Sequence, residues 1–223
     1  MAIVRRQPPR SARRAPRPNG PKVTGPRSRS QVAGPWDAAR VTSVVGLLLA
    51  AGAGERYGGP KALARDDDGT SWLLRSVQAL RPCAEIVVVL GAEAGRAAAL
   101  LPMSVSRIRC DDWAEGMGAS LRTGLEALSY TDHDAVLVSL VDLPDVDAAV
   151  VDRVLDAAHG RATLARAAYD GVPGHPVLLG RDHWAGVVDA ATGDRGARDY
   201  LATHAVELVE CGDLATGTDV DHR

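Results

Sequence analysis

From Val44 onward, short apolar runs alternate with segments whose apolar residues recur at helical spacing. This alternation constrains the fold more than any other feature of the chain. The runs at 44–50, 85–90 and 135–140 are nearly continuous in aliphatic residues, as is typical of strands covered on both faces. Such alternation predicts a mainly parallel sheet with helices on both sides. We therefore expect an α/β fold, a three-layer sandwich with a Rossmann-like sheet.

The remaining elements are predicted from the same patterns. Further strands are expected at 106–110, 162–169, 176–179 and 205–210, and helices at 71–80, 93–101, 119–128, 146–158 and 195–204. In sheets of this kind, ligands bind outside the carboxyl ends of the strands. The loops at those ends are therefore the places to expect a site: 51–61, 91–95, 111–120 and 141–145.

The first 40 residues differ in composition from the rest. They carry ten Lys or Arg against one acidic residue, Asp37, and are rich in Pro, Ser and Gly. Such a segment buries too little apolar area to offset its ordering entropy. We expect 1–40 to be a disordered extension and 41–223 to form the folded domain. A basic arm for an acidic partner and an organelle presequence are the alternatives for the extension.

Composition also limits the partners and the compartment of the domain. Its net charge is acidic, which is a poor match for nucleic acid. No apolar run is as long as a membrane span needs. The three cysteines, which are far apart and form no CxxC pair, favour a reducing cytoplasm. We expect a cytoplasmic protein that binds neither nucleic acid nor membrane.

A glycine-rich loop, LAAGAGERYGGPK at 49–61, follows the first strand. Small residues let backbone N–H groups approach phosphate oxygens, while Arg56 and Lys61 add positive charge. Two better-known loops are excluded by spacing. Tyr57 stands where a dinucleotide fingerprint needs its third glycine, and Ala62 stands where a P-loop needs Ser or Thr. Lys61 is the only lysine of the expected domain.

This loop resembles that of molybdenum cofactor nucleotidyltransferases. Four further stretches resemble the cytidylyltransferase branch: GMGASLRTGL at 116–125, VDLPDV at 141–146, GHPVL at 174–178 and GDRGAR at 193–198. The resemblance implies the fold of nucleotide-diphospho-sugar transferases. It also implies transfer of CMP from CTP to the terminal phosphate of the molybdenum-bound pterin cofactor, with release of pyrophosphate. A molybdoenzyme or its chaperone is the implied protein partner.

The resemblance also implies roles for individual residues. The catalytic residues are expected to be Arg56 and Lys61. The expected nucleotide-binding residues are Leu49, Ala50, Ala51, Gly52, Gly54, Arg56, Lys61, Gly116 and Ser120. The expected acceptor-binding residues are Gly174, His175, Pro176, Asp194, Arg195 and Arg198. For Gly116–Ser120 a second interpretation stays open, namely that this stretch serves only as a glycine-rich N-cap of the following helix.

A carboxylate pair is expected to hold the cation that phosphoryl transfer needs, and Mg²⁺ is the usual ion. Asp142 follows the apolar strand 135–140 and matches the family's metal-binding aspartate. Asp219 and Asp221 are the candidates for the second ligand, although the TPED residues that relatives carry there are missing. Asp145 is predicted to cap the helix that begins near it.

Three other functions stay open at this point. The first is a transferase of the same fold that uses GTP or another acceptor. Ala50-Ala51-Gly52 favours CTP, because the guanylyl branch usually has two glycines there. The second is an NAD(P)H-dependent oxidoreductase on this scaffold, because nicotine-blue oxidoreductase resembles the same family. The third is a nucleotide-binding relative without catalysis.

Overall fold

The computed structural model describes residues 43–222. The predicted disordered extension, 1–40, lies outside the described residues. The described chain forms a sheet of seven strands in the order β3-β2-β1-β4-β6-β5-β7. The strands are β1 (Val44–Ala50), β2 (Glu85–Leu90), β3 (Ser106–Arg109), β4 (Ala135–Leu140), β5 (Leu164–Tyr169), β6 (Val172–Gly180) and β7 (Glu207–Glu210).

Most of the sheet is parallel. β1 pairs in parallel with β2 on one side and with β4 on the other, and β3 continues the parallel set beyond β2. β6 runs antiparallel to both β4 and β5, and β7 is parallel to β5. In the register of β1 and β4, Leu49 lies opposite Leu140, so the loops after these two strands leave the sheet side by side.

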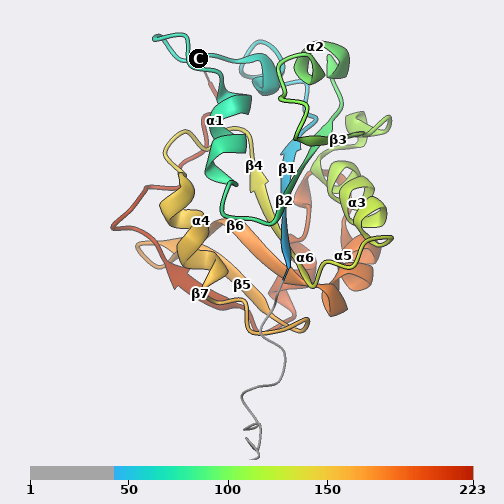
Figure 1. The fold of residues 1–223 in the computed structure, drawn as a ribbon, viewed down its shortest axis with the longest axis vertical. Helices are drawn as coiled ribbons and strands as arrows, with labels where there is room; N and C mark the ends of the chain where they lie inside the picture. The colour runs from blue at the N-terminus through green and yellow to red at the C-terminus, as the bar shows by residue number, and fades with distance from the viewer. Residues whose placement is uncertain (1–42, 223) are drawn as a thin grey trace, which may run out of the picture. The chain divides into compact units, whose positions relative to one another are not determined.

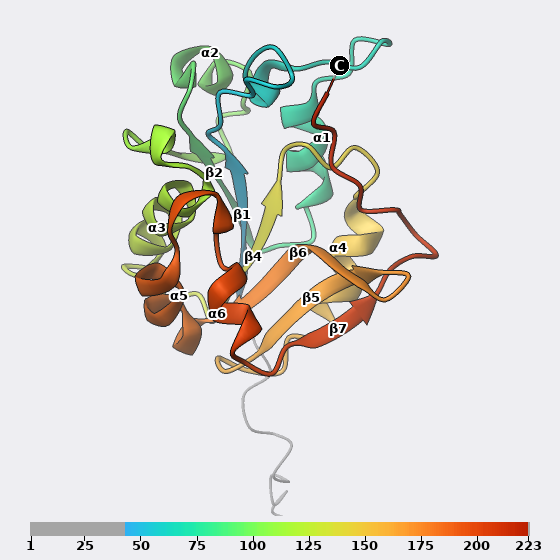
Figure 2. The same cartoon turned by 180° about the vertical axis from the view of Figure 1, so that it is seen from behind.

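Helices cover both faces of the sheet (Figures 1 and 2). The helices are α1 (Trp72–Ala79), α2 (Ala94–Ala98), α3 (Met117–Leu128), α4 (Ala148–Leu155), α5 (Trp184–Ala190) and α6 (Arg198–Ala202). Short 3-10 helices lie at Lys61–Leu63, Trp113–Glu115, Arg181–His183 and Gly193–Arg195. No helix of the part that the structure describes is long and apolar enough to cross a membrane.

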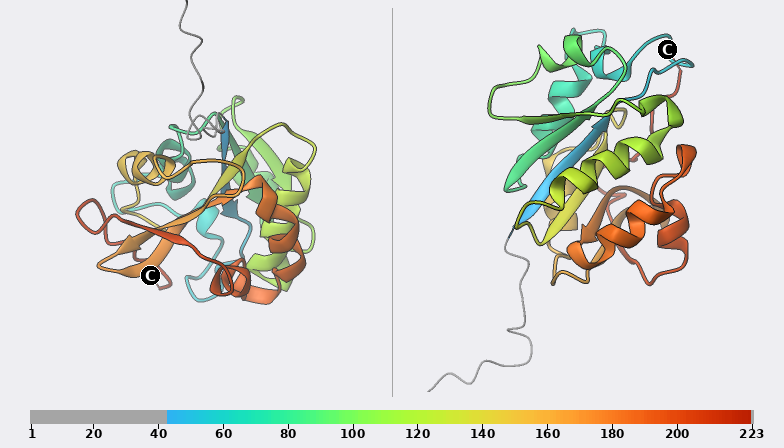
Figure 3. Two further views of the ribbon diagram at one scale, coloured as in Figure 1. Left: turned by 90° about the horizontal axis from the view of Figure 1, so that it is seen from below. Right: turned by 90° about the vertical axis from the view of Figure 1, so that its right-hand side faces the viewer.

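Two apolar cores fill the space between the layers. One core joins the sheet to α1, α2 and α4, with Leu73, Val150 and Val154 fully buried. The other joins the opposite face to α3, α5 and α6 and contains Leu125 and Val187. Figure 3 shows α3 in front of the parallel strands in its right-hand view. The predicted three-layer α/β sandwich with a mainly parallel sheet is therefore confirmed.

Three local predictions differ from the structure. α5 was not predicted, because its segment WAGVVDA was too short to display a helical period. β6 begins at Val172, earlier than expected, since it pairs with β5 across a tight turn. The N-cap of α4 is Asp147, whose side chain accepts from Ala149 N at 2.9 Å, and not Asp145.

Candidate functional site

A cleft of about 630 Å³ opens at the carboxyl ends of β1 and β4. Fourteen of the residues predicted for the site line this cleft, although they come from five separate parts of the chain. They are Leu49, Ala50, Ala51, Gly52, Gly54, Arg56, Lys61, Gly116, Ser120, Asp142, Asp194, Arg198, Asp219 and Asp221. The parallel strands deliver the first loop and Asp142 to one edge of the sheet, as the fold class predicts.

The glycine-rich loop is a tight turn built around one glycine. The carbonyl oxygen of Gly54 accepts from the N–H groups of Tyr57, Gly58 and Gly59 at 3.0, 2.9 and 3.0 Å. Gly54 has a φ of 62°, and a Cβ there would lie 2.1 Å from the Gly59 carbonyl oxygen. Gly52, by contrast, faces open space, and a Cβ there would have nothing within 4 Å. The loop thus leaves room for a ligand to approach its backbone closely.

Lys61 lies at the centre of the charged groups. Its Nζ donates to Asp142 Oδ2 at 2.8 Å and to Asp221 Oδ1 at 2.9 Å. Arg56 reaches the other oxygen of Asp221 at 3.1 Å. Burial opposes the charge of Lys61, but the hydrogen bonds and charges of the two aspartates outweigh it and raise its pKa. The hydrogen bond and charge of Lys61 in turn lower the pKa of Asp221.

The C-terminal segment carries Asp219 and Asp221 to this point through specific contacts. Val220 N donates to the carbonyl oxygen of Asp142 at 3.1 Å. Earlier in the segment, the N–H and the hydroxyl of Thr216 donate to Asp145 Oδ2 at 2.6 and 2.7 Å. Asp145 therefore anchors the chain end instead of capping α4, because its carboxylate faces the incoming segment.

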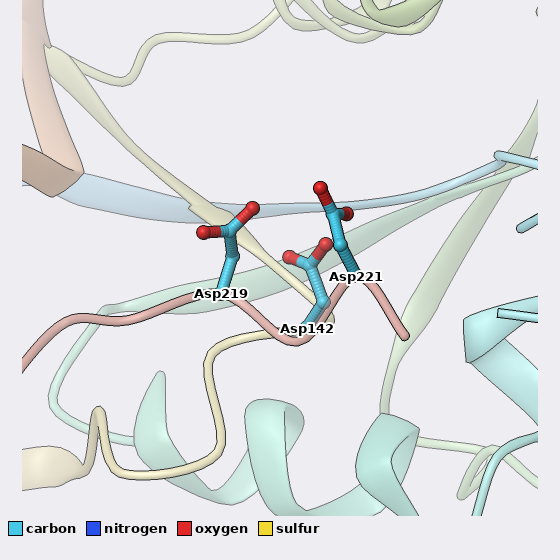
Figure 4. Close-up of side chains that lie close together, drawn as sticks. All are labelled: Asp142, Asp219 and Asp221. Atoms are coloured by element: carbon cyan, nitrogen blue, oxygen red, sulfur yellow. The ribbon is translucent and has the colours of Figure 1, made fainter. Parts of the chain in front are cut away.

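Asp142, Asp219 and Asp221 form a cluster that suits a hard divalent cation. One carboxylate oxygen from each residue lies within 4.8 Å of the others. Figure 4 shows the three carboxylates on the same side, with Asp142 at the end of β4 and the other two on the C-terminal segment. Asp142 Oδ1 is buried and has no hydrogen-bond partner among the described residues. An unpartnered buried carboxylate oxygen fits a ligand of Mg²⁺ or a similar ion.

A third wall of the cleft comes from residues 113–120. Gly116 caps α3 with a φ of 111°, and a Cβ there would lie 2.5 Å from Asp194 Oδ1. The same glycine lines the cleft, and so does the buried Ser120. The capping interpretation and the ligand-binding interpretation of this stretch are thus compatible. Half-buried Trp113 and Met117 also line this wall.

Only some of the predicted acceptor-binding residues line the cleft. Asp194 and Arg198 line the cleft, whereas Gly174, His175, Pro176 and Arg195 are not among its lining residues. Arg195 forms an ion pair with Asp199 on the adjacent α6. The peptide bond between His175 and Pro176 is cis. Burial, together with the charges of Arg166 and Arg198, lowers the pKa of His175 to about 4, so its imidazole is neutral at pH 7.

Sequence reasoning missed some residues of this region. Tyr57, Trp113 and Met117 line the cleft, but a glycine-rich loop and a helix start give no pattern that assigns side chains to a ligand. Tyr57 is held by its ring contact with Trp72, at a centroid distance of 5.0 Å.

Comparisons with known proteins show the family to which the chain belongs. Residues 46–208 match the family described as the MobA-like NTP transferase domain. The chain is 36% identical over 195 residues to nicotine blue oxidoreductase of Paenarthrobacter nicotinovorans, covering 80% of this chain and 92% of that protein. It is also 36% identical over 118 residues to a protein of Rhodopirellula baltica named "Probable molybdenum cofactor guanylyltransferase", covering 52% of this chain and 54% of that protein.

Among solved structures, the fold is similar to Rv0371c of Mycobacterium tuberculosis H37Rv, in a crystal structure of its complex with manganese. The TM-score is 0.63 at 24% identity, with 80% of this chain and 94% of that chain covered. At this level of identity the likeness concerns the fold.

Proposed function

Because the chain belongs to the MobA-like NTP transferase domain family, we propose that this nucleotidyltransferase moves CMP from CTP to the terminal phosphate of the molybdenum-bound pterin cofactor. Pyrophosphate is the second product. The cytoplasm is the proposed compartment, and a molybdoenzyme or its chaperone is the proposed recipient of the product.

One observation carries the proposal. A glycine-rich turn, a lysine and three aspartates meet in one cleft, and Lys61 lies within 2.9 Å of two of those aspartates. Positive charge and free backbone N–H groups suit a triphosphate, while the carboxylates suit the cation that accompanies it. An apolar substrate would have no use for so many charges in one place.

The proposed reaction is an in-line displacement. An oxygen of the acceptor phosphate forms a bond to the α-phosphorus, and the bond from that phosphorus to the bridging oxygen of the β-phosphate breaks. The attacking phosphate is already ionised at pH 7, so the chain need not supply a base. Arg56, Lys61 and the loop N–H groups hold the triphosphate, and preorganised charge of this kind stabilises the developing negative charge.

Asp142, with Asp219 and Asp221, would hold Mg²⁺ or a related cation. The ion would supply neutralisation of the polyphosphate charge. The ammonium of Lys61 lies against Asp142 and Asp221. We propose that Lys61 would also donate to the phosphates of a bound nucleotide.

The choice of CTP rests on the space at the start of the loop. Ala50 and Ala51 are almost fully buried and line the cleft, as does Trp113. A Cβ at Gly91 would lie 2.6 Å from Ala51 O and 2.5 Å from Trp113 Cβ, so the start of the loop and Trp113 both pack closely against the end of β2. A pyrimidine needs less room here than a purine does.

Nucleotide binding and pyrophosphate release test the proposal together. CTP, GTP, ATP and UTP would be compared for binding with Mg²⁺, and Asp142→Asn would be compared with the native protein for release. Asp142→Asn keeps the shape of the side chain and removes the charge, so it should fold normally and lose about 100-fold in rate. Normal release from the folded variant would refute the metal role, and tighter binding of GTP would transfer the proposal to guanylyl transfer.

A second candidate is an oxidoreductase, favoured by the 36% identity to nicotine blue oxidoreductase along 92% of that protein. Tyr57, in place of the third glycine of a dinucleotide fingerprint, argues against a nicotinamide cofactor bound in the usual manner. The assay is NADH and NADPH binding and oxidation in the presence of a dye acceptor. Cofactor oxidation without any pyrophosphate release would favour this candidate, and it would also distinguish it from a nucleotide-binding protein without catalysis.

A further inference from the structure

Two loops of the cleft, 113–118 and 191–196, pack directly against each other, and we call them the paired loops. Trp113 lines the cleft from the first loop, and Asp194 lines it from the second. A Cβ at Gly118 would lie 2.9 Å from a backbone nitrogen of the second loop, so the two backbones approach as closely as a glycine allows. The position of each loop therefore depends on the position of the other.

One arginine of α3 contacts both of the paired loops. The Nη1 of Arg122 donates to the carbonyl oxygen of Ala191 at 2.6 Å, and its Nη2 donates to Glu115 Oε2 at 2.8 Å. Glu115 belongs to the first loop, and Ala191 is the residue at which α5 ends and the second loop begins. Arg122 is not among the residues that line the cleft, so its effect on a ligand must pass through the loops.

A guanidinium suits this position because it is a planar fork whose nitrogens serve two acceptors at once. The side chain of Arg122 is 29% exposed, so solvent screens its contacts only in part. A lysine would keep the positive charge, but its ammonium is a single point on a flexible stem. Such a point could hold one loop only by leaving the other. The bridge between the loops therefore depends on the shape of the arginine as well as on its charge.

We propose that Arg122 is a positioning residue, which holds the paired loops at a fixed spacing and thereby sets the spacing of the two substrates. The first loop includes Gly116 of the expected nucleotide-binding set, and the second carries Asp194 of the expected acceptor-binding set. This inference rests on the proposed function. It further implies that a nucleotide bound against the first loop orders the second loop, although the two are far apart in the sequence.

The proposed role predicts a larger effect on rate than on binding. An in-line displacement needs the attacking oxygen close to the α-phosphorus and opposite the leaving pyrophosphate. A misplacement of about 1 Å can cost about 100-fold in rate. The triphosphate itself is held by Lys61 and the glycine-rich loop, which Arg122 does not contact. Loss of the bridge should therefore lower kcat and leave KM for the nucleotide nearly unchanged.

The experiment compares Arg122→Lys with a matched control, Arg181→Lys, in the full chain. Arg181 is also half-buried and also serves two acceptors, the carbonyl oxygens of His133 at 2.9 Å and of Ser129 at 2.7 Å. None of the three residues of the control lines the cleft or belongs to the paired loops. The control should therefore lose a similar amount of stability without moving the loops. Glu115→Gln weakens only one of the two bonds at an exposed position, so it tests the bridge even if Arg122→Lys unfolds.

The first measurement is hydrogen exchange at the amides of Gly116 and Arg195, which close a turn in the first and the second loop. Without ligand, Arg122→Lys should speed exchange at both amides by about tenfold, and the control should not. In the native protein, CTP with Mg²⁺ should slow exchange at both. In Arg122→Lys, CTP should still slow exchange at Gly116 but no longer at Arg195, because the loops are uncoupled.

The second measurement is pyrophosphate release, with kcat and KM determined separately. We expect kcat to fall by about 100-fold in Arg122→Lys and by less in Glu115→Gln, and to stay native in the control. Native exchange and native kcat in a folded Arg122→Lys protein would overturn the inference, and so would an equal loss in the control. If the native protein neither binds CTP nor releases pyrophosphate, the proposed function fails. Exchange without ligand then decides whether Arg122 joins the loops.

Discussion

Removing the charge of Lys61 should cost stability as well as activity. The side chains of Lys61 and Asp142 are only 14% and 17% exposed, and they are joined at 2.8 Å. In Lys61→Met the carboxylate of Asp142 stays buried without a partner and lies near Asp221. A charge left unpaired in this manner typically costs about 1–3 kcal/mol, which corresponds to a melting temperature lower by about 2–10 °C in a domain of this size.

A divalent cation should reverse much of that loss. On the proposed function, Mg²⁺ would bind the folded aspartate cluster and not the unfolded chain, so mass action would stabilise the folded state. The effect should be larger in Lys61→Met than in the native protein, because in the variant no ammonium competes for Asp142 and Asp221. Pyrophosphate release should nevertheless stay about 100-fold below native, since the cation does not replace the contact of Lys61 with the triphosphate.

The assay is thermal unfolding in EDTA and in Mg²⁺, with pyrophosphate release measured on the same preparations. Arg56→Met is the matched control: it lies on the same loop and also contacts Asp221, but its side chain is 74% exposed. Its melting temperature should be almost unchanged, because solvent screens an exposed pair. A Lys61→Met protein that melts like the native protein in EDTA would refute the reasoning.

Three further outcomes are expected. Asp145→Ala removes both bonds from Thr216, so it should lower Mg²⁺ affinity by about tenfold with little change in melting temperature, as measured by calorimetry; unchanged affinity would show that the chain end needs no anchor. Because the pKa of His175 is lowered from 6.5 to about 4, the folded state should lose about 3 kcal/mol of stability as pH falls from 6.5 to 4. In denaturant titrations over that pH range, His175→Gln should make the free energy of unfolding less dependent on pH. His159→Gln, an exposed control, should leave that dependence unchanged. Deletion of residues 1–40 should leave melting temperature and nucleotide affinity unchanged, and a large loss of either would contradict the composition argument.

Much of the fold could be predicted from the sequence, because strands covered on both faces leave continuous apolar runs. β1, β2 and β4 were predicted with their observed bounds. The antiparallel insertion of β6 could not be predicted, since it depends on pairing partners and not on the strand's own pattern. α5 was missed for a similar reason: its burial depends on Trp184 and Val187 packing against α3, which a seven-residue segment cannot indicate.

The site was predictable wherever a strand end fixes it. The loop after β1 and Asp142 after β4 are adjacent because the two strands pair in register. The position of Asp221 depends instead on bonds between distant residues, such as Thr216 to Asp145, that no local pattern encodes. The pairing of Arg195 with Asp199 is, by contrast, a local contact between residues four apart at the start of α6.

The contacts of Lys61 with Asp142 and Asp221 should couple the binding of the triphosphate to the binding of the cation. A triphosphate alone would have to draw the ammonium away from two carboxylates and would meet the negative charge of Asp142, Asp219 and Asp221 at close range. A cation alone meets the ammonium instead. Together the two ligands would remove both conflicts, because a cation held by the aspartates would neutralise their charge and leave Lys61 available to the phosphates. Each ligand should therefore raise the affinity of the other by the same factor, as linkage requires, and this mutual dependence is a property of the charges that already meet in the cleft.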